Sequence, residues 1–367
     1  MHGPVDHKIY VQPLGILRGC HAFEAASAGY ARWLASGPLA FTMVRIIYRH
    51  ETSQYDEALI PLCEIDQYLS GITAVQQEDI SGLLKRISAA RQPMDFSGHK
   101  SLTWQRPLIQ GIVNVTPDSF SDGGCYARPQ EAIDHAHRLI EAGADIIDIG
   151  GESTRPGAAK VSPREELDRV MPVIEGLADI SVPISIDTRH AAVMEKALAA
   201  GASLINDVSA LCHDDKSMAV AVASACPVIL MHAQNNPKNM QDNPQYENVV
   251  LDVYNYLERR IADCLAAGIR RHNIIIDPGI GFGKTLAHNM ALMANLSLFH
   301  GLGAPLLLGV SRKSFIGHIT GEKDTASRLS GSLTFGLMGY EQGVHILRVH
   351  DVAETHQARE SWAATLE

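Results

Sequence analysis

The chain has 367 residues, and its 31 basic and 41 acidic side chains give a formal net charge of −10, which excludes the overall positive field that attracts nucleic acid or anionic membranes. Its six cysteines lie far apart without a CxxC pair, which argues against a zinc site and a disulfide scaffold. Because no leader pattern and no apolar run of about 18 residues occurs, we expect a cytoplasmic protein without nucleic-acid or membrane partners.

The first hundred residues predict a small α/β extension over residues 1–92. The segment AGYARWLASGPLAFTMVRIIYRH, residues 28–50, predicts a helical piece and then an alternating strand, and QEDISGLLKRISAAR, residues 77–91, predicts an amphipathic helix. Residues 93–106, PMDFSGHKSLTWQR, predict a linker with a possible hairpin that covers the bottom of the next domain. No chemical motif occurs in this extension, so a packing or dimer-stabilising role is the favoured interpretation.

Residues 107–367 show a regular alternation of short β-rich runs and segments with helical spacing. Several helical segments end at a glycine suited to a left-handed cap, namely Gly143, Gly201, Gly268 and Gly343. The eight predicted strands are 108–114, 145–150, 182–187, 203–208, 227–231, 273–277, 305–310 and 344–349. Eight evenly spaced units predict a (β/α)8 TIM barrel, and the absence of GxGxxG after the first strand disfavours an open dinucleotide-binding sheet.

All eight predicted strands end in polar or charged residues. Barrel enzymes place their chemistry on the loops at the carboxyl ends of the strands, so these residues predict one shared site. The strand ends are Asn114, Ser153 to Arg155, Asp187, Asn206 with Asp207, His232, Asp277, Ser311 to Ser314, and Arg348 with His350 and Asp351.

The motifs at these ends, in order, are GIVNVTPDSFSDGG, DIGGESTRPGA, SIDT, IND, LMH, DPGIGFGK, SRKSFIG and RVHDV. This ordered set, over residues 106–367, resembles the dihydropteroate synthase family of pterin-binding enzymes. The resemblance implies a sulfonamide-sensitive transferase of folate biosynthesis, a homodimer, that joins 6-hydroxymethyl-7,8-dihydropterin diphosphate to p-aminobenzoate and releases dihydropteroate and diphosphate. The chain departs from the family at Ala233 and Asn235, where related enzymes commonly carry Met and Gly.

A diphosphate leaving group needs cations, oriented donors and Mg²⁺. Arg348 and His350 stand at alternate positions after the last strand and are the expected anion ligands. Asn114 is expected to give Mg²⁺ one amide oxygen, because this ion keeps several non-protein ligands. The alternatives are a surface ion pair with Asp351 for the two cations and a turn-forming role for Asn114.

A pterin presents a guanine-like donor edge that a buried carboxylate accepts in two hydrogen bonds. Asp277, at the end of an apolar strand, is the expected acceptor, and the resemblance places Asn206 and Lys313 in the same pocket. Asp187 is expected to oppose positive charge on the pterin methylene during an SN1-like departure of diphosphate. The alternative for each carboxylate is a helix N-cap.

The carboxylate of p-aminobenzoate suits a helix N-terminus, and Ser314 is expected there. Pro156 and Phe282 are candidate walls for its ring, and Thr154 with Arg155 is expected to complete the pocket once diphosphate is bound. We expect catalytic roles for Asp187, Lys313, Asp118 and Arg155, the last two on the loops after the first two strands. Two other functions stay open: a non-catalytic pterin-binding homologue, and a folate-dependent methyltransferase-type barrel.

Overall fold

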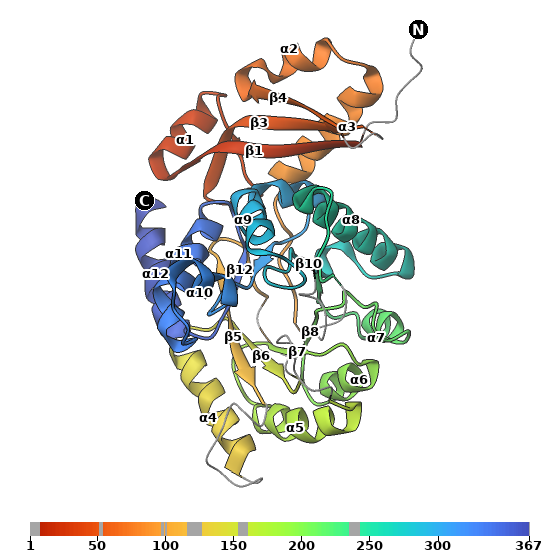
Figure 1. Ribbon diagram of the computed structural model, residues 1–367, viewed down its shortest axis with the longest axis vertical. Coiled ribbons are helices and arrows are strands. Elements are labelled where there is room, and N and C mark those ends of the chain that lie inside the picture. Colours follow the sequence, from red (N-terminus) through yellow and green to blue (C-terminus); the bar gives the residue numbers. More distant parts are fainter. Residues whose placement is uncertain are drawn as a thin grey trace.

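The computed structural model describes residues 8–50, 54–96, 99, 101–115, 127–152, 161–234 and 243–366. It shows a four-stranded sheet with helices at the amino-terminal end, seated on a larger barrel of parallel strands (Figure 1). Within the described residues, no helix is long and apolar enough to cross a membrane.

The larger part is a closed barrel, as the sequence predicted. Its strands are β5 (Leu108–Asn114), β6 (Ile146–Gly150), β7 (Ile184–Asp187), β8 (Leu204–Asp207), β9 (Val228–Met231), β10 (Ile274–Asp277), β11 (Leu307–Leu308) and β12 (Ile346–Val349). Neighbouring strands are parallel in the order β10-β9-β8-β7-β6-β5-β12-β11. A parallel bridge between Ile276 and Leu306 joins the first and last strands of this order. The strand predicted over residues 305–310 is shorter than expected, since only Leu307–Leu308 has strand geometry.

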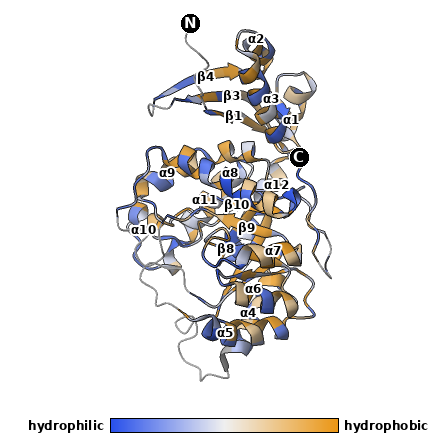
Figure 2. Ribbon diagram, turned by 90° about the vertical axis from the view of Figure 1, so that its right-hand side faces the viewer, coloured by the Kyte–Doolittle hydropathy of each residue, from blue (hydrophilic) through white to orange (hydrophobic). Residues whose placement is uncertain are grey.

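Helices surround the strands and connect them in the expected alternation. They are α4 (Ala127–Glu141), α5 (Pro163–Gly176), α6 (Ala191–Ala199), α7 (Ser217–Ser224), α8 (Val249–Ala267), α9 (Leu286–Ala294), α10 (Ser314–Thr320), α11 (Leu329–Tyr340) and α12 (Val352–Ala363), with short 3-10 turns η3 (Arg271–Asn273), η4 (Leu296–Leu302), η5 (Ala326–Arg328) and η6 (Ala364–Leu366). The capping glycines Gly143, Gly201, Gly268 and Gly343 all have positive φ, of 101°, 116°, 108° and 80°. Figure 2 shows β9 in hydrophobic colours and mixed colours on the helices around it, as expected for strands covered on the outside by helices.

The amino-terminal sheet is antiparallel, with β3 in its centre. Its elements are β1 (Lys8–Arg18), α1 (Gly19–Ser27), β2 (Arg32–Trp33), β3 (Leu39–Arg49), β4 (Tyr55–Pro61), η1 (Leu62–Glu64), α2 (Ile65–Ser70) and α3 (Ala74–Ser88). The helical piece expected within residues 28–50 was wrong: the helix lies earlier, as α1, and Gly29 after it takes a φ of 79° that ends it. The strand and the amphipathic helix that follow were predicted correctly, as β3 and α3.

The bottom of the barrel is closed by the segment between the two parts. Met94 and Leu102 form an antiparallel bridge whose two N–H···O distances are both 2.9 Å. Met94 and Phe96 pack in one apolar cluster with the strand residues Leu108, Ile146, Leu204, Ile229, Ile275, Leu307 and Ile346. Filling this end leaves the carboxyl ends of the strands as the place for a ligand.

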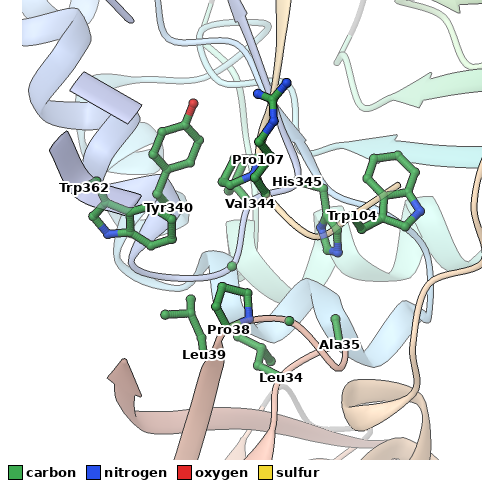
Figure 3. A pocket seen from close by; sticks show the side chains of 13 residues that line it. Leu34, Ala35, Pro38, Leu39, Trp104, Pro107, Tyr340, Val344, His345 and Trp362 are labelled. Atoms are coloured by element: carbon green, nitrogen blue, oxygen red, sulfur yellow. The ribbon is translucent and has the colours of Figure 1, made fainter. Parts of the chain in front are cut away.

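A small cavity lies at the seam between the amino-terminal sheet and the barrel (Figure 3). Its volume is about 30 Å³, and Leu34, Pro38, Trp104, Tyr340 and Trp362 are among the residues that line it. A space of this size holds a water molecule or two. This cavity is too small for a pterin.

Candidate active site

Arg348 stands at the centre of a charged cluster at the carboxyl ends of four strands. Its Nε donates to Asp148 Oδ2 at 2.6 Å, and its Nη2 donates to Asp187 Oδ2 at 2.7 Å. Asn206 Nδ2 donates to the same Asp148 oxygen at 3.2 Å. Strands β12, β6, β7 and β8 therefore bring three of the predicted residues into one hydrogen-bonded network.

Asp148 belongs to this network and was not among the residues predicted from the sequence. It lies within β6 between two isoleucines, and none of its surface is exposed. A carboxylate in such a strand is costly unless it is paired, and here it is paired with Arg348 and Asn206. The signal in the sequence was an acid inside the apolar run IIDIG, two residues before the end of the predicted strand.

Burial and neighbouring charges shift the pKa values of Asp187 and Arg348. Burial raises the pKa of Asp187 to about 7; Asp148 contributes in the same direction, while Arg348 opposes the shift. Burial disfavours the charge of Arg348, but Asp148 and Asp187 outweigh it and raise the pKa of the guanidinium above its usual value. The cluster thus holds a cation beside a carboxylate whose pKa is raised by burial.

A second wall of the site comes from the loop after β10. Asp277 Oδ1 accepts the N–H of Gly279 at 2.7 Å, so one carboxylate oxygen shapes its own turn. Lys313 Nζ donates to the carbonyl of Ile280 and lies 4.6 Å from the ring centroid of Phe282. Burial lowers the pKa of Lys313 to about 8, and Asp277 opposes that shift. Burial raises the pKa of Asp277, and Lys313 opposes this in turn.

Lys284 fastens this loop and was also missed from the sequence. Its buried Nζ donates to the carbonyls of Gly279 at 2.8 Å, Phe282 at 3.0 Å and His232 at 3.3 Å, and lies 3.0 Å from His232 Nδ1. Burial lowers the pKa of Lys284 well below its usual value. The signal in the sequence was the lysine that closes the motif DPGIGFGK.

The residues after β11 and β12 form the opposite side. His350 Nδ1 lies 3.0 Å from Ser311 Oγ, and Ser311 Oγ accepts the His350 N–H at 3.1 Å. Arg312 Nε donates to Asp351 Oδ2 at 2.9 Å. Arg312 therefore binds the Asp351 carboxylate, and the alternative of an ion pair between Arg348 and Asp351 is wrong, because Arg348 is paired with Asp148 and Asp187.

The helix N-cap alternative fails for Asp187 and for Asp277. The helix that follows Asp187 has His190 as its N-cap. The helix that follows Asp277 is capped by Thr285, whose hydroxyl oxygen accepts the His288 N–H. The two carboxylates are thus left for other roles.

Other predicted residues lie at the margin of this site or beyond what the structure describes. Ser314 begins α10 and is exposed, and Asn114 ends β5 opposite Gly150 of β6. Ala233 follows His232 and is partly buried. The predicted residues outside the described part of the chain are Asp118, Thr154, Arg155, Pro156 and Asn235.

The family model for pterin-binding enzymes matches residues 110–350. The chain belongs to the pterin-binding enzyme family. Within this family it is 51% identical to dihydropteroate synthase from Neisseria meningitidis serogroup C over 271 residues, which cover 73% of this chain and 96% of that relative. It is 47% identical to dihydropteroate synthase from Escherichia coli K12 over 272 residues, which cover 74% of this chain and 96% of that relative.

Solved structures of dihydropteroate synthases are similar to this chain in both sequence and fold. Dihydropteroate synthase of Yersinia pestis, in complex with a sulfonamide drug, has a TM-score of 0.71 at 46% identity and covers 75% of this chain and 99% of its own. The enzyme of Xanthomonas albilineans in complex with 7,8-dihydropteroate has a TM-score of 0.68 at 43% identity, and the match covers 75% of this chain and 98% of that enzyme. The chain is thereby placed among the dihydropteroate synthases, which are transferases of folate biosynthesis.

Proposed function

We propose that the chain condenses 6-hydroxymethyl-7,8-dihydropterin diphosphate with p-aminobenzoate to give 7,8-dihydropteroate and diphosphate. The observation that carries this is the partly buried Arg348, held between Asp148 and Asp187 at the carboxyl end of the barrel. It sets a fixed cation beside a carboxylate, which is what a reaction with an anionic leaving group and a cationic carbon needs. Relatives of about half identity are dihydropteroate synthases, and a solved relative is complexed with 4-aminobenzoic acid.

The pterin would lie between the β8 and β10 ends. Asp277 would accept the donor edge of the ring, Asn206 would add a hydrogen bond, and Lys313 would reach a ring nitrogen or carbonyl. Phe282, the candidate wall for the p-aminobenzoate ring, borders this pocket, because the cation of Lys313 lies over its ring. All four side chains come from elements that the barrel fixes near Arg348.

The chemical step would be SN1-like. The bond between the pterin methylene carbon and the diphosphate oxygen breaks first, and its electron pair leaves with the oxygen. Asp187 stabilises the resulting cation, and the lone pair of the neutral aromatic amine then forms the new C–N bond. The amine loses one proton to solvent or to the departing diphosphate, so no strong base is required of the protein.

The diphosphate would be held by Arg348, His350 and Mg²⁺. Within the described ranges there is no group of three or more His, Cys, Asp or Glu that could hold a metal ion. A single amide oxygen from Asn114 would suit Mg²⁺, which usually keeps substrate oxygens and waters as its main ligands. When bound, Mg²⁺ would neutralise charge on the leaving group.

The p-aminobenzoate would lie toward α10, with its carboxylate at Ser314. Thr154, Arg155 and Pro156 are proposed to complete this pocket, and Asp118 and Arg155 to take part in catalysis, by the resemblance to the family. We further propose that the protein is a cytoplasmic homodimer. We also propose that sulfonamides inhibit it, because the Yersinia pestis relative has been solved in complex with a sulfonamide drug.

Turnover by the purified chain tests this proposal. Dihydropteroate should form from both substrates with Mg²⁺, and Lys313→Ala should abolish most of it by removing the partly buried cation of the pterin pocket. Absence of product despite tight binding of the pterin diphosphate would instead support a non-catalytic homologue. Turnover of a methyl-folate substrate would support the methyltransferase alternative, which the synthase relatives disfavour.

A further inference from the structure

Arg49 connects the amino-terminal sheet to the barrel close to the active-site end. It ends β3, its side chain is 16% exposed, and its Nη1 donates to Asp252 Oδ1 at 2.9 Å, while its Nη2 donates to the carboxylate of Glu247. Arg49 lies before residue 110, where the family match begins. Relatives are covered over 96% of their length by about three quarters of this chain, so most of the unmatched quarter is this amino-terminal part.

The carboxylate that Arg49 binds fixes the start of α8. Its other oxygen, Asp252 Oδ2, accepts the N–H groups of Glu247 at 3.0 Å and Asn248 at 3.1 Å. Asn248 is the N-cap of the helix, and its Oδ1 accepts the N–H of Val250 at 3.1 Å. Arg49 therefore neutralises and orients the group that sets the end of the connection from β9 to α8.

That connection in turn touches the loop that carries the pterin wall. Tyr246 OH donates to the carbonyl of Gly283 at 2.7 Å, and Gln234 Nε2 donates to the carbonyl of Gln245 at 2.9 Å. A Cβ on Gly283 would lie 2.6 Å from the Gln234 carbonyl oxygen, so the two loops are in direct backbone contact. Gly283 follows Phe282, whose ring lies under Lys313 Nζ.

We propose that Arg49 is a positioning residue for the pterin pocket. Through Asp252 and Glu247 it holds residues 245–248 in the place from which Tyr246 supports the β10 loop. The amino-terminal extension thus does more than stabilise the barrel: it supplies one of the supports of the substrate wall. The inference rests on the proposed function only in its choice of ligand, the pterin diphosphate.

Arg45 provides a matched control. It lies on the same strand four residues earlier, so it points to the same face of the sheet. Its Nη2 donates to Asn295 Oδ1 at 2.6 Å, at the carboxyl end of α9, which belongs to the opposite end of the barrel. Losing Arg45 also breaks a contact between the two parts, but away from the pterin wall.

The experiment compares Arg49→Met with Arg45→Met in the full chain, by melting temperature, steady-state kinetics and calorimetric binding of the pterin diphosphate. We expect Arg49→Met to raise the Kd and KM for this ligand by about fivefold or more, the range of ordinary couplings between sites. We expect Arg45→Met to leave the Kd and the KM for the pterin diphosphate within about twofold of the wild-type values. It should lower the melting temperature about as much as Arg49→Met does. Arg49→Lys keeps the charge but loses the two-carboxylate fork, so it should show a partial rise.

A double-mutant comparison tests the route. Tyr246→Phe removes the bond to Gly283, and its effect on pterin Kd should not add to that of Arg49→Met if both act through one support. Equal pterin binding by Arg49→Met and by Arg45→Met would overturn the inference. Because binding is measured directly, this result is distinct from a wild-type chain that forms no dihydropteroate, which would overturn the proposed function instead.

Discussion

Arg348 decides the electrostatics of the site at the level of single residues. Its guanidinium is held by Asp148 and Asp187, so its position is set before any substrate binds. A cation that is already oriented costs little reorganisation when negative charge develops nearby. The two aspartates differ in role, because Asp148 is fully buried and also binds Asn206, whereas Asp187 sits at the strand end.

Asp187→Asn should lower kcat by about 100-fold or more, because an amide cannot oppose the positive charge of the transition state. Diphosphate affinity should change by less than about twofold, because Asp148 still holds Arg348 Nε. Single-turnover kinetics and calorimetry with diphosphate separate the two effects. A variant with wild-type turnover would show that Asp187 has another role.

The pH dependence of kcat/KM should be bell-shaped with a narrow top. Burial raises the pKa of Asp187 to about 7, so the needed carboxylate is lost as pH falls through this value. Burial lowers the pKa of Lys313 to about 8, so the needed cation is lost as pH rises through that value. Lys313→Arg should remove the alkaline limb and keep the acid limb. A flat wild-type profile from about pH 6 to pH 9 would contradict both assignments.

The loop after β10 is the element that brings the proposed pterin wall together. Gly279 has a φ of +68°, and Lys284 binds three carbonyls of the loop and of its neighbour His232. These contacts stack the β10 loop on the end of β9. They explain why a side chain as polar as Lys284 is only 3% exposed.

Gly279→Ala should destabilise the chain more than Gly321→Ala. Both glycines have positive φ, of +68° and +82°, which costs an alanine about 1 kcal/mol or more. A Cβ at residue 321 meets nothing within 4 Å, whereas one at residue 279 would lie 1.9 Å from the His232 carbonyl oxygen. Urea unfolding of the two variants measures the difference. Equal losses would mean that the loop moves aside without cost.

The two parts of the whole molecule share one apolar core. A single cluster of buried side chains runs from Val11, Ile46 and Ile80 of the amino-terminal part to Leu257 and Phe299 of the barrel. Tyr10 of β1 crosses this boundary: its ring packs edge-on against Tyr254 at 5.3 Å, and its OH donates to Asn255 at 2.9 Å. We therefore expect both parts to unfold together.

Tyr10→Ala should lower the free energy of unfolding by about 3 to 5 kcal/mol, the usual cost of deleting a buried aromatic ring. Circular dichroism and tryptophan fluorescence should report one transition, moved as a whole to lower urea. Tyr30→Ala, at a side chain that is 61% exposed, is the control and should leave the midpoint unchanged. Two separate transitions in the Tyr10 variant would show that the parts are independent.

The sequence by itself determined the barrel and the polar side chains at the carboxyl ends of several of its strands. Alternating apolar strands and glycine-capped helices depend on local spacing, so β5 to β12 could be placed to within a few residues. Asp187, Asn206, Asp277 and Arg348 followed from one rule, since the carboxyl ends of parallel strands meet at one face. The prediction of a helical piece within residues 28–50 was wrong, because helix propensity alone does not reveal the turns at Gly29 and before β3.

The tertiary structure alone decided which charges are paired. Asp148 and Arg348 are 200 residues apart, and Arg49 and Asp252 are 203 apart, so no local pattern links either pair. It also decided that the amino-terminal sheet reaches the active-site end of α8, because a sheet's docking face depends on packing across the whole molecule. Buried charges choose partners by distance and desolvation after folding, and those quantities exist only in three dimensions.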